Sequence, residues 1–189
     1  RTLSGCVDIW DHLQLEDTFK SGKSSNIKQI AHLSSAILWT DSTVKALVEN
    51  SIEGLLLVYS ARLDELRKQV RTSKEYSSPL AIQTVNSALV LQLLHQRDIL
   101  QRLMLQNVSE LTNFIWQCSI RNYLGKGDCT VQLMTLTRKY CFEYLGMQER
   151  ICLTPTTDRC LMSLAHSLES AQIGGLHGSG DSGKTSTVG

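Results

Sequence analysis

One segment near residue 180 has the residue types and spacing of a phosphate-binding loop. It follows the pattern G-x-x-x-x-G-K-[ST], in which Lys184 and Thr185 are the last two positions. Glycines let such a loop curl, so that backbone N–H groups point into one concavity beside a helix N-terminus. Lys184 is expected to bridge the β- and γ-phosphates of a nucleotide, and the Thr185 hydroxyl to bind Mg²⁺. The predicted phosphate-binding residues are Gly178, Ser179, Gly180, Asp181, Ser182, Gly183, Lys184, Thr185 and Ser186. A Gly-Ser-rich linker that matches the pattern by chance is the alternative.

The elements that must position this loop are short strands and one helix. After Gly125 and Gly127 the apolar pattern changes from helical spacing to alternation, which is typical of strands. Strands are predicted at 129–134, 140–144 and 151–154, the first two as a hairpin, and at 173–177, directly before the loop. A helix is predicted from a cap at Thr156, Thr157 or Asp158 to Ser170, with Leu161, Leu164, Ala165 and Leu168 inward. Asp158 and Arg159 could be read as catalytic residues, but helix capping and a local ion pair are the preferred interpretation.

The earlier part of the chain has the spacing of long amphipathic helices. A helix is predicted at 27–39, and another from a cap at Thr40, Asp41 or Ser42 to about Arg71. The pair Ser78-Pro79 predicts the start of a further helix, which continues to Leu103. A fourth is predicted from Ser109 to about Tyr123, with Leu111, Phe114, Ile115 and Trp116 on its apolar side. Trp39 and Trp116 are interpreted as core residues.

Composition excludes several classes of protein. Nineteen basic residues against 18 acidic ones leave a net charge of +1, so we expect no nucleic-acid partner. No apolar run approaches the roughly 18 residues that span a bilayer, so no membrane association is expected either. The six cysteines include no C-x-x-C pair and are expected to be free thiols. The chain begins with Arg1 and ends at Gly189 within a motif, so we expect part of a longer polypeptide.

Several further segments stand out beside the phosphate loop: 37–40 (ILWT), 95–98 (HQRD), 113–116 (NFIW), 121–123 (RNY), 128–131 (DCTV), 140–146 (YCFEYLG) and 154–160 (TPTTDRC). Together with the loop, these segments resemble the dynein heavy chains, at the end of the linker and the start of the first AAA+ module. The resemblance covers about residues 30 to 189 in the family's order, and the stretch from Glu143 to Cys160 is its most specific part.

The resemblance implies a fold that is mostly α with a C-terminal α/β part. A helical linker bundle at 27–124 would precede the N-terminal part of the first AAA+ ATP-binding module at 125–189, with 1–26 unassigned. The residues expected beside the adenine are Ile151, Cys152, Leu153 and Thr154. The cofactors implied are ATP or ADP and Mg²⁺, the latter held by Thr185.

The resemblance also implies the function of a longer parent protein. That parent would be a P-loop ATPase, a motor driving microtubule-based movement from the cytoplasm and cytoskeleton, including the cilium or flagellar axoneme. Its partners would be other AAA+ modules of the same chain, dynein intermediate and light chains, and microtubules. The 189 residues alone are expected to be inactive, and no catalytic residue is assigned among them.

Two departures from the family pattern favour an alternative. Family members mostly have an uncharged residue where this chain has Asp181, and usually Pro-Ala where it has Ser179-Gly180. The carboxylate of Asp181 is expected to weaken nucleotide binding without abolishing it. The alternative is therefore a dynein-like scaffold, needed for ciliary or flagellar assembly, that binds nucleotide weakly or without turnover. A helical interaction domain or an unrelated P-loop protein is the third possibility.

Overall fold

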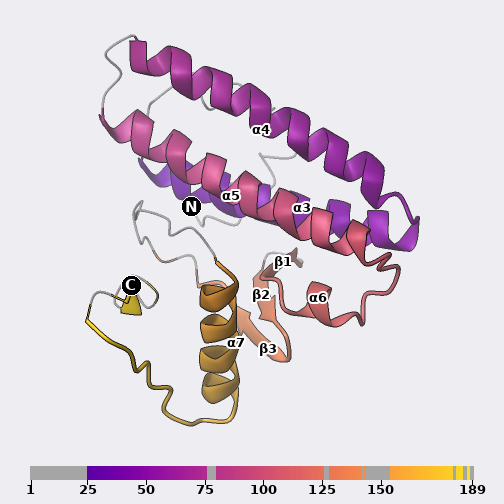
Figure 1. The fold of residues 1–189 in the computed structure, drawn as a ribbon, viewed down its shortest axis with the longest axis vertical. Helices are drawn as coiled ribbons and strands as arrows, with labels where there is room; N and C mark the ends of the chain where they lie inside the picture. Colours follow the sequence, from indigo (N-terminus) through magenta and orange to yellow (C-terminus); the bar gives the residue numbers. More distant parts are fainter. Residues whose placement is uncertain are drawn as a thin grey trace.

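The computed structural model describes residues 25–75, 80–125, 128–141, 143, 154–180, 182–184 and 187. Within these residues the chain is mostly helical and contains one small antiparallel sheet (Figure 1). The elements are α3 (Ser25–Val48), α4 (Ile52–Glu75), α5 (Leu80–Leu105), α6 (Phe114–Gln117), β1 (Arg121–Leu124), β2 (Cys129–Leu133), β3 (Leu136–Lys139) and α7 (Pro155–Glu169). The predicted dominance of helix, with strands confined to the later part of the chain, is confirmed.

The hydrophobic core lies among the three long helices α3, α4 and α5, which we call the long-helix layer. In Figure 1, α4 lies along α5, and α3 crosses behind α5 in this view; α3 contacts both of the other helices. Leu63 of α4 and Leu100 and Leu103 of α5 are at most 1% exposed. The other buried members of this core are Trp39, Ala46, Leu47, Ile52, Tyr59, Leu93, Ile99, Val108 and Trp116. The apolar stripes of the sequence are therefore packing surfaces.

The first helix boundary differs from the prediction. Thr40, Asp41 and Ser42 cap no helix, because α3 runs through them to Val48. The hydroxyl of Thr40 instead donates to the Ala36 carbonyl, 2.9 Å away, one turn earlier in the same helix. The helix ends later, at Val48, and Asn50 just beyond it has a left-handed φ of 53°. The N–H of Ser51 then donates to the Ala46 carbonyl at 2.9 Å, which ends α3 in the manner of a Schellman motif.

The predicted helix from Ser109 to Tyr123 is wrong. Only α6 is helical there, and its N-cap is Asn113, whose side chain accepts from the Ile115 N–H at 2.9 Å. Residues 121–124 form β1 instead, because their backbone pairs with β2. Trp116 is nevertheless a core residue, as predicted. Its ring lies 5.5 Å from that of Trp39, centroid to centroid, and is 1% exposed.

The sheet is antiparallel, with strand order β1-β2-β3. The predicted strand 129–134 is confirmed as β2, but its partner β3 precedes the predicted 140–144, where Tyr140, Cys141 and Glu143 form no strand. A tight turn at Met134, with φ of 53°, brings the chain back after only two residues, which fixes the register Leu133 to Leu136. The predicted strand 151–154 lies outside the described residues, apart from Thr154.

The sheet is joined to the long-helix layer by a buried contact. The N–H of Asn122 in β1 donates to the Thr40 hydroxyl at 3.1 Å, and Thr40 is completely buried. Cys129 of β2 is also fully buried, in a small cluster with Leu33 and Ile37 of α3. β1 lies before the expected domain boundary at 124 and β2 after it, so the sheet spans this boundary. The division at that residue stays a prediction.

The predicted helix before the phosphate loop is confirmed as α7. Its N-cap is Thr154 rather than Thr156, Thr157 or Asp158, and Pro155 occupies the first helical position. Ala165 is buried and Leu161 and Leu164 are half-buried, but Leu168, predicted inward, is 63% exposed. The helix ends at Glu169, and Ala171, which follows the C-cap Ser170, has φ of 52°, while the Gln172 N–H donates to the Ser167 carbonyl at 2.8 Å.

The remaining predictions concern residues 173–177, the cysteines and membrane-spanning helices. The predicted strand 173–177 is wrong: these residues form no strand, because no neighbouring strand pairs with them, and Ile173 is fully exposed. The described cysteines are free thiols, as expected: Cys118, Cys129, Cys141 and Cys160. Among the described residues, no helix combines the length and apolar character that a membrane span requires.

Candidate phosphate-binding site

The phosphate loop follows α7 through a short extended segment. Figure 1 shows this segment leaving the end of α7 opposite Pro155 and turning back toward the loop. Gly174 lies directly against the helix: a Cβ at this position would be 2.7 Å from Cδ2 of Leu164 and 3.5 Å from Cβ of Ser167. A larger residue at this position would therefore require the Leu164 side chain to shift.

Within the loop, the Lys184 side chain folds back over the residues that precede it. Its ammonium Nζ donates to the Gly178 carbonyl at 3.0 Å, to the Ser182 hydroxyl at 3.1 Å, and to the Ser179 carbonyl. The Ser182 hydroxyl in turn donates to the Ser179 carbonyl at 2.9 Å. Gly178, Ser179 and Ser182, all from the predicted phosphate-binding set, thus form one hydrogen-bonded unit around the Lys184 ammonium.

A helical turn begins where the loop ends. Gly183 has φ of +78°, a left-handed conformation that side-chain-bearing residues rarely adopt. Its carbonyl accepts from both the N–H of Thr187, at 3.0 Å, and the Thr187 hydroxyl, at 2.8 Å. The first of these is the i to i−4 bond of an α-helix. The transition from loop to helix that the motif predicts is therefore present at its second glycine.

The structure does not bring all the predicted site residues together. Asp181, Thr185 and Ser186 lie outside the described residues, as do the predicted adenine-side residues Ile151, Cys152 and Leu153. Thr154, the remaining adenine-side residue, caps α7: its hydroxyl oxygen accepts from the Thr157 N–H at 3.3 Å and lies 2.9 Å from the Thr157 hydroxyl. Its role beside an adenine stays a prediction.

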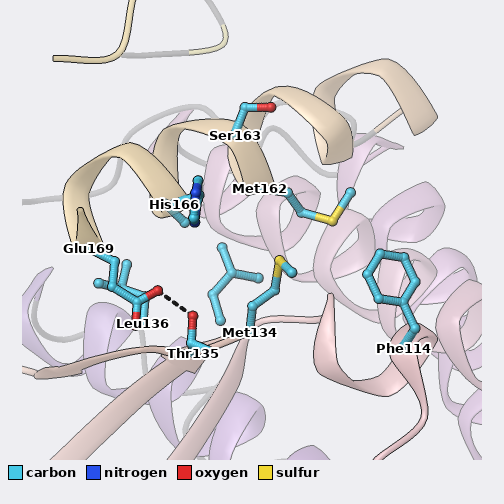
Figure 2. A pocket seen from close by; sticks show the side chains of 10 residues that line it. Phe114, Met134, Thr135, Leu136, Met162, Ser163, His166 and Glu169 are labelled. Atoms are coloured by element: carbon cyan, nitrogen blue, oxygen red, sulfur yellow. Dashed lines mark hydrogen bonds between the residues drawn. The ribbon is translucent and has the colours of Figure 1, made fainter. Parts of the chain in front are cut away.

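A cavity of about 280 Å³ separates α7 from the β2–β3 turn (Figure 2). Met134 and Leu136 line it from the hairpin, Met162 lines it from α7, and Phe114 of α6 lies at one end. At the other end the Thr135 hydroxyl donates to the Glu169 carboxylate. This contact holds the last turn of α7 to the hairpin, although the space between them is incompletely filled.

A second cavity, of about 260 Å³, lies among α5, α6 and α7. At its edge Arg102 of α5 and Asp158 of α7 form an ion pair of 3.4 Å. Asp158 therefore pairs with a residue 56 positions away, so the local ion pair predicted for it is wrong. Burial raises the pKa of the Cys118 thiol in this cavity, and the nearby Asp158 carboxylate raises it further.

The sequence placed Ser182 in the predicted phosphate-binding set but did not indicate its contacts with Lys184 and Ser179. The motif leaves its position unspecified, and only the folded loop places its hydroxyl between Lys184 and Ser179. A serine in a glycine-rich loop was the only available signal.

In the described part of the chain, no group of three or more His, Cys, Asp or Glu side chains is arranged to hold a metal ion.

Comparison with known proteins covers both α7 and the loop. A family model described as "Hydrolytic ATP binding site of dynein motor region" matches residues 140–189. The chain is 31% identical over 160 residues to "Dynein axonemal heavy chain 3" of Homo sapiens, an alignment that covers 85% of this chain and 4% of that protein. The chain therefore belongs to the dynein heavy chain family. The resemblance predicted from its motifs is confirmed.

Dynein heavy chains of different types match this segment about equally well. It is 28% identical over 164 residues to "Cytoplasmic dynein 2 heavy chain 1" of Tripneustes gratilla, covering 85% of the chain and 4% of that relative. It is also 28% identical over 199 residues to "Dynein heavy chain, cytoplasmic" of Dictyostelium discoideum, covering 96% of the chain and 4% of that relative. The dynein segment thus spans about 4% of the length of these relatives.

Proposed function

We propose that this chain is the end of the linker and the start of the first ATP-binding module of a dynein-type motor. Residues 27–124 would form the linker part and 125–189 the first part of an AAA+ module. The observation that carries the proposal is the loop closed around Lys184, which lies inside the segment that matches the hydrolytic ATP-binding site. An ammonium group held over a glycine-rich turn suits a triphosphate, because phosphate oxygens are stronger acceptors than backbone carbonyls.

The residues present fit a nucleotide with Mg²⁺. Lys184 would exchange its carbonyl acceptors for phosphate oxygens, and the glycines would let the backbone approach the phosphates. The hydroxyl of Thr185 would hold the metal ion, and Ile151, Cys152, Leu153 and Thr154 would lie beside the adenine. When bound, the metal ion would neutralise charge on the phosphates.

The parent protein would couple ATP hydrolysis to movement along microtubules. This proposal rests on the dynein heavy chains that match the segment, which are of both axonemal and cytoplasmic types. Other AAA+ modules of the same chain, dynein intermediate and light chains, and microtubules would be its partners. Its location would be the cytoplasm and cytoskeleton, including the cilium or axoneme.

The test is a titration with fluorescently labelled ATP and Mg²⁺, on the chain extended through the whole first module. Tight binding that is lost in Lys184→Ala, together with phosphate release above that variant, is the expected result. Binding that Lys184→Ala abolishes, without phosphate release, would replace the motor with the dynein-like scaffold. No binding, or equal binding by the parent and Lys184→Ala, would overturn the nucleotide site itself.

A further inference from the structure

Among the described residues of the loop, the Lys184 ammonium has as many acceptors as it has hydrogens. A lysine ammonium carries three N–H groups, and the acceptors described for Lys184 are the carbonyls of Gly178 and Ser179 and the hydroxyl of Ser182. Two of these acceptors are backbone atoms, which any residue would supply. The third is a side chain, so only the contact with Ser182 depends on the residue type.

The orientation of the Ser182 hydroxyl is fixed by a second bond. Its single O–H donates to the Ser179 carbonyl at 2.9 Å. The lone pairs of Oγ are therefore left to accept, and the Lys184 ammonium lies 3.1 Å from this oxygen. A phosphate that displaces the two carbonyls from the ammonium would leave this side-chain contact in place.

We propose that Ser182 is a positioning residue, whose hydroxyl holds the Lys184 ammonium over the loop where phosphate oxygens would meet it. The inference rests on the proposed function, in which Lys184 is the phosphate-binding lysine. It adds that the fourth variable position of the motif carries a required hydroxyl group.

Gly178 provides the space that this hydroxyl occupies. A Cβ at Gly178 would lie 2.9 Å from Oγ of Ser182, closer than atoms pack, whereas a Cβ at Gly180 would meet nothing within 4 Å. Both glycines lack the left-handed φ that marks Gly183. Alanine at Gly178 should therefore displace the Ser182 hydroxyl, and alanine at Gly180 is the matched control in the same loop.

The direct test follows the side chain of Lys184 without nucleotide. The 189-residue chain is treated with limiting acetic anhydride, and acetylation of Lys184 is measured by mass spectrometry relative to the exposed Lys45. Because the amine must leave its acceptors before it reacts, Ser182→Ala should raise the relative rate about two- to fivefold, as expected for the loss of one hydrogen bond. Ser182→Thr, which keeps the hydroxyl, should restore the parent rate, Gly178→Ala should resemble Ser182→Ala, and Gly180→Ala should leave the rate unchanged.

An unchanged rate in Ser182→Ala overturns the proposal, and so does a rise that Ser182→Thr fails to reverse. A second readout is the dissociation constant for ATP with Mg²⁺ on the extended chain. Ser182→Ala should raise it about threefold and Ser182→Thr should not. If Lys184→Ala leaves ATP binding unchanged, the proposed function fails, whereas the acetylation rates still decide whether Ser182 positions Lys184.

Discussion

The long-helix layer and the phosphate loop are stabilised in different ways. In the layer, Leu63, Leu100 and Leu103 are removed from water by side chains that come from distant parts of the sequence. In the loop, the hydrogen bonds of Lys184 with other described residues join positions at most six apart, and all of these bonds are exposed. Burial therefore supplies the stability of the chain, while the loop takes its shape from short-range hydrogen bonds. Substitutions in the loop are therefore not expected to disturb the core.

Helix α7 lies between these two regions in the sequence. Among the described residues, a small number of polar contacts join it to the rest of the fold. Arg102 contacts Asp158 near its start, Thr135 contacts Glu169 near its end, and two cavities lie alongside. Surface polar contacts of this kind contribute little to stability. Substitutions in the long-helix layer should therefore change the free energy of unfolding strongly, and those around α7 should change it little.

The largest effect is expected from Leu100→Ala. Leu100 is completely buried in α5, so its truncation leaves a cavity and should lower the free energy of unfolding by about 3 kcal/mol. The matched control is Leu105→Ala in the same helix, where the side chain is 68% exposed and the loss should stay below about 0.5 kcal/mol. Urea unfolding followed by circular dichroism measures both. Equal losses would contradict the placement of the core.

A smaller effect is expected from Thr40→Val, which tests the contact between the layer and the sheet. Valine keeps the shape of threonine but leaves the N–H of Asn122 without the hydroxyl oxygen, 3.1 Å away, that it donates to. A buried donor left unsatisfied should cost about 1 to 3 kcal/mol. Ser60→Ala is the control, because that hydroxyl only donates to the Leu56 carbonyl one turn earlier. If Thr40→Val lowers the free energy of unfolding no more than Ser60→Ala does, the hydrogen bond from Asn122 to Thr40 does not stabilise the contact between the sheet and the layer.

The stability of the layer and sheet should fall at alkaline pH. Burial raises the pKa of the Cys129 thiol, and burial likewise raises the pKa of Tyr59. Above about pH 8.5, the ordinary cysteine value, the unfolded chain gives up the Cys129 proton while the folded chain retains it. This contribution is full below that pH and is lost as the pH rises through the folded value. Unfolding free energies from pH 7 to 10 should decline, and less steeply in Cys129→Ala; identical slopes would refute the assignment.

The smallest effect is expected at the ion pair between α5 and α7. Arg102 and Asp158 lie 3.4 Å apart, and their side chains are 46% and 26% exposed. A double-mutant cycle with Arg102→Met and Asp158→Asn should give a coupling energy below about 1 kcal/mol. The cycle is needed because Asp158 also lies in the first turn of α7, where a negative charge is favourable by itself. A larger coupling energy would show that the ion pair attaches α7 to α5 more strongly than a surface contact does.

The sequence by itself determined the features that depend on local chemistry. Apolar residues at helical spacing predicted the buried stripe of α5, since Leu93, Leu100 and Leu103 share one face of any helix that contains them. Helix α7 was also predicted, with a cap two to four residues after the observed N-cap Thr154. The spacing of the phosphate-loop glycines and Lys184 likewise indicated a loop that turns into a helix, because left-handed φ at Gly183 is a property of that residue.

Only the tertiary structure decided the features that depend on distant partners. Residues 121–124 were expected to be helical, and they are a strand because β2 pairs with them and Thr40 accepts from Asn122. Residues 173–177 have an apolar pattern but no adjacent strand, so their backbone forms no sheet. Thr40 and Asp158 were read as local caps and pair instead with residues 82 and 56 positions away. A strand, a buried hydrogen bond and an ion pair each need a second segment, and spacing along one segment does not specify which segment that is.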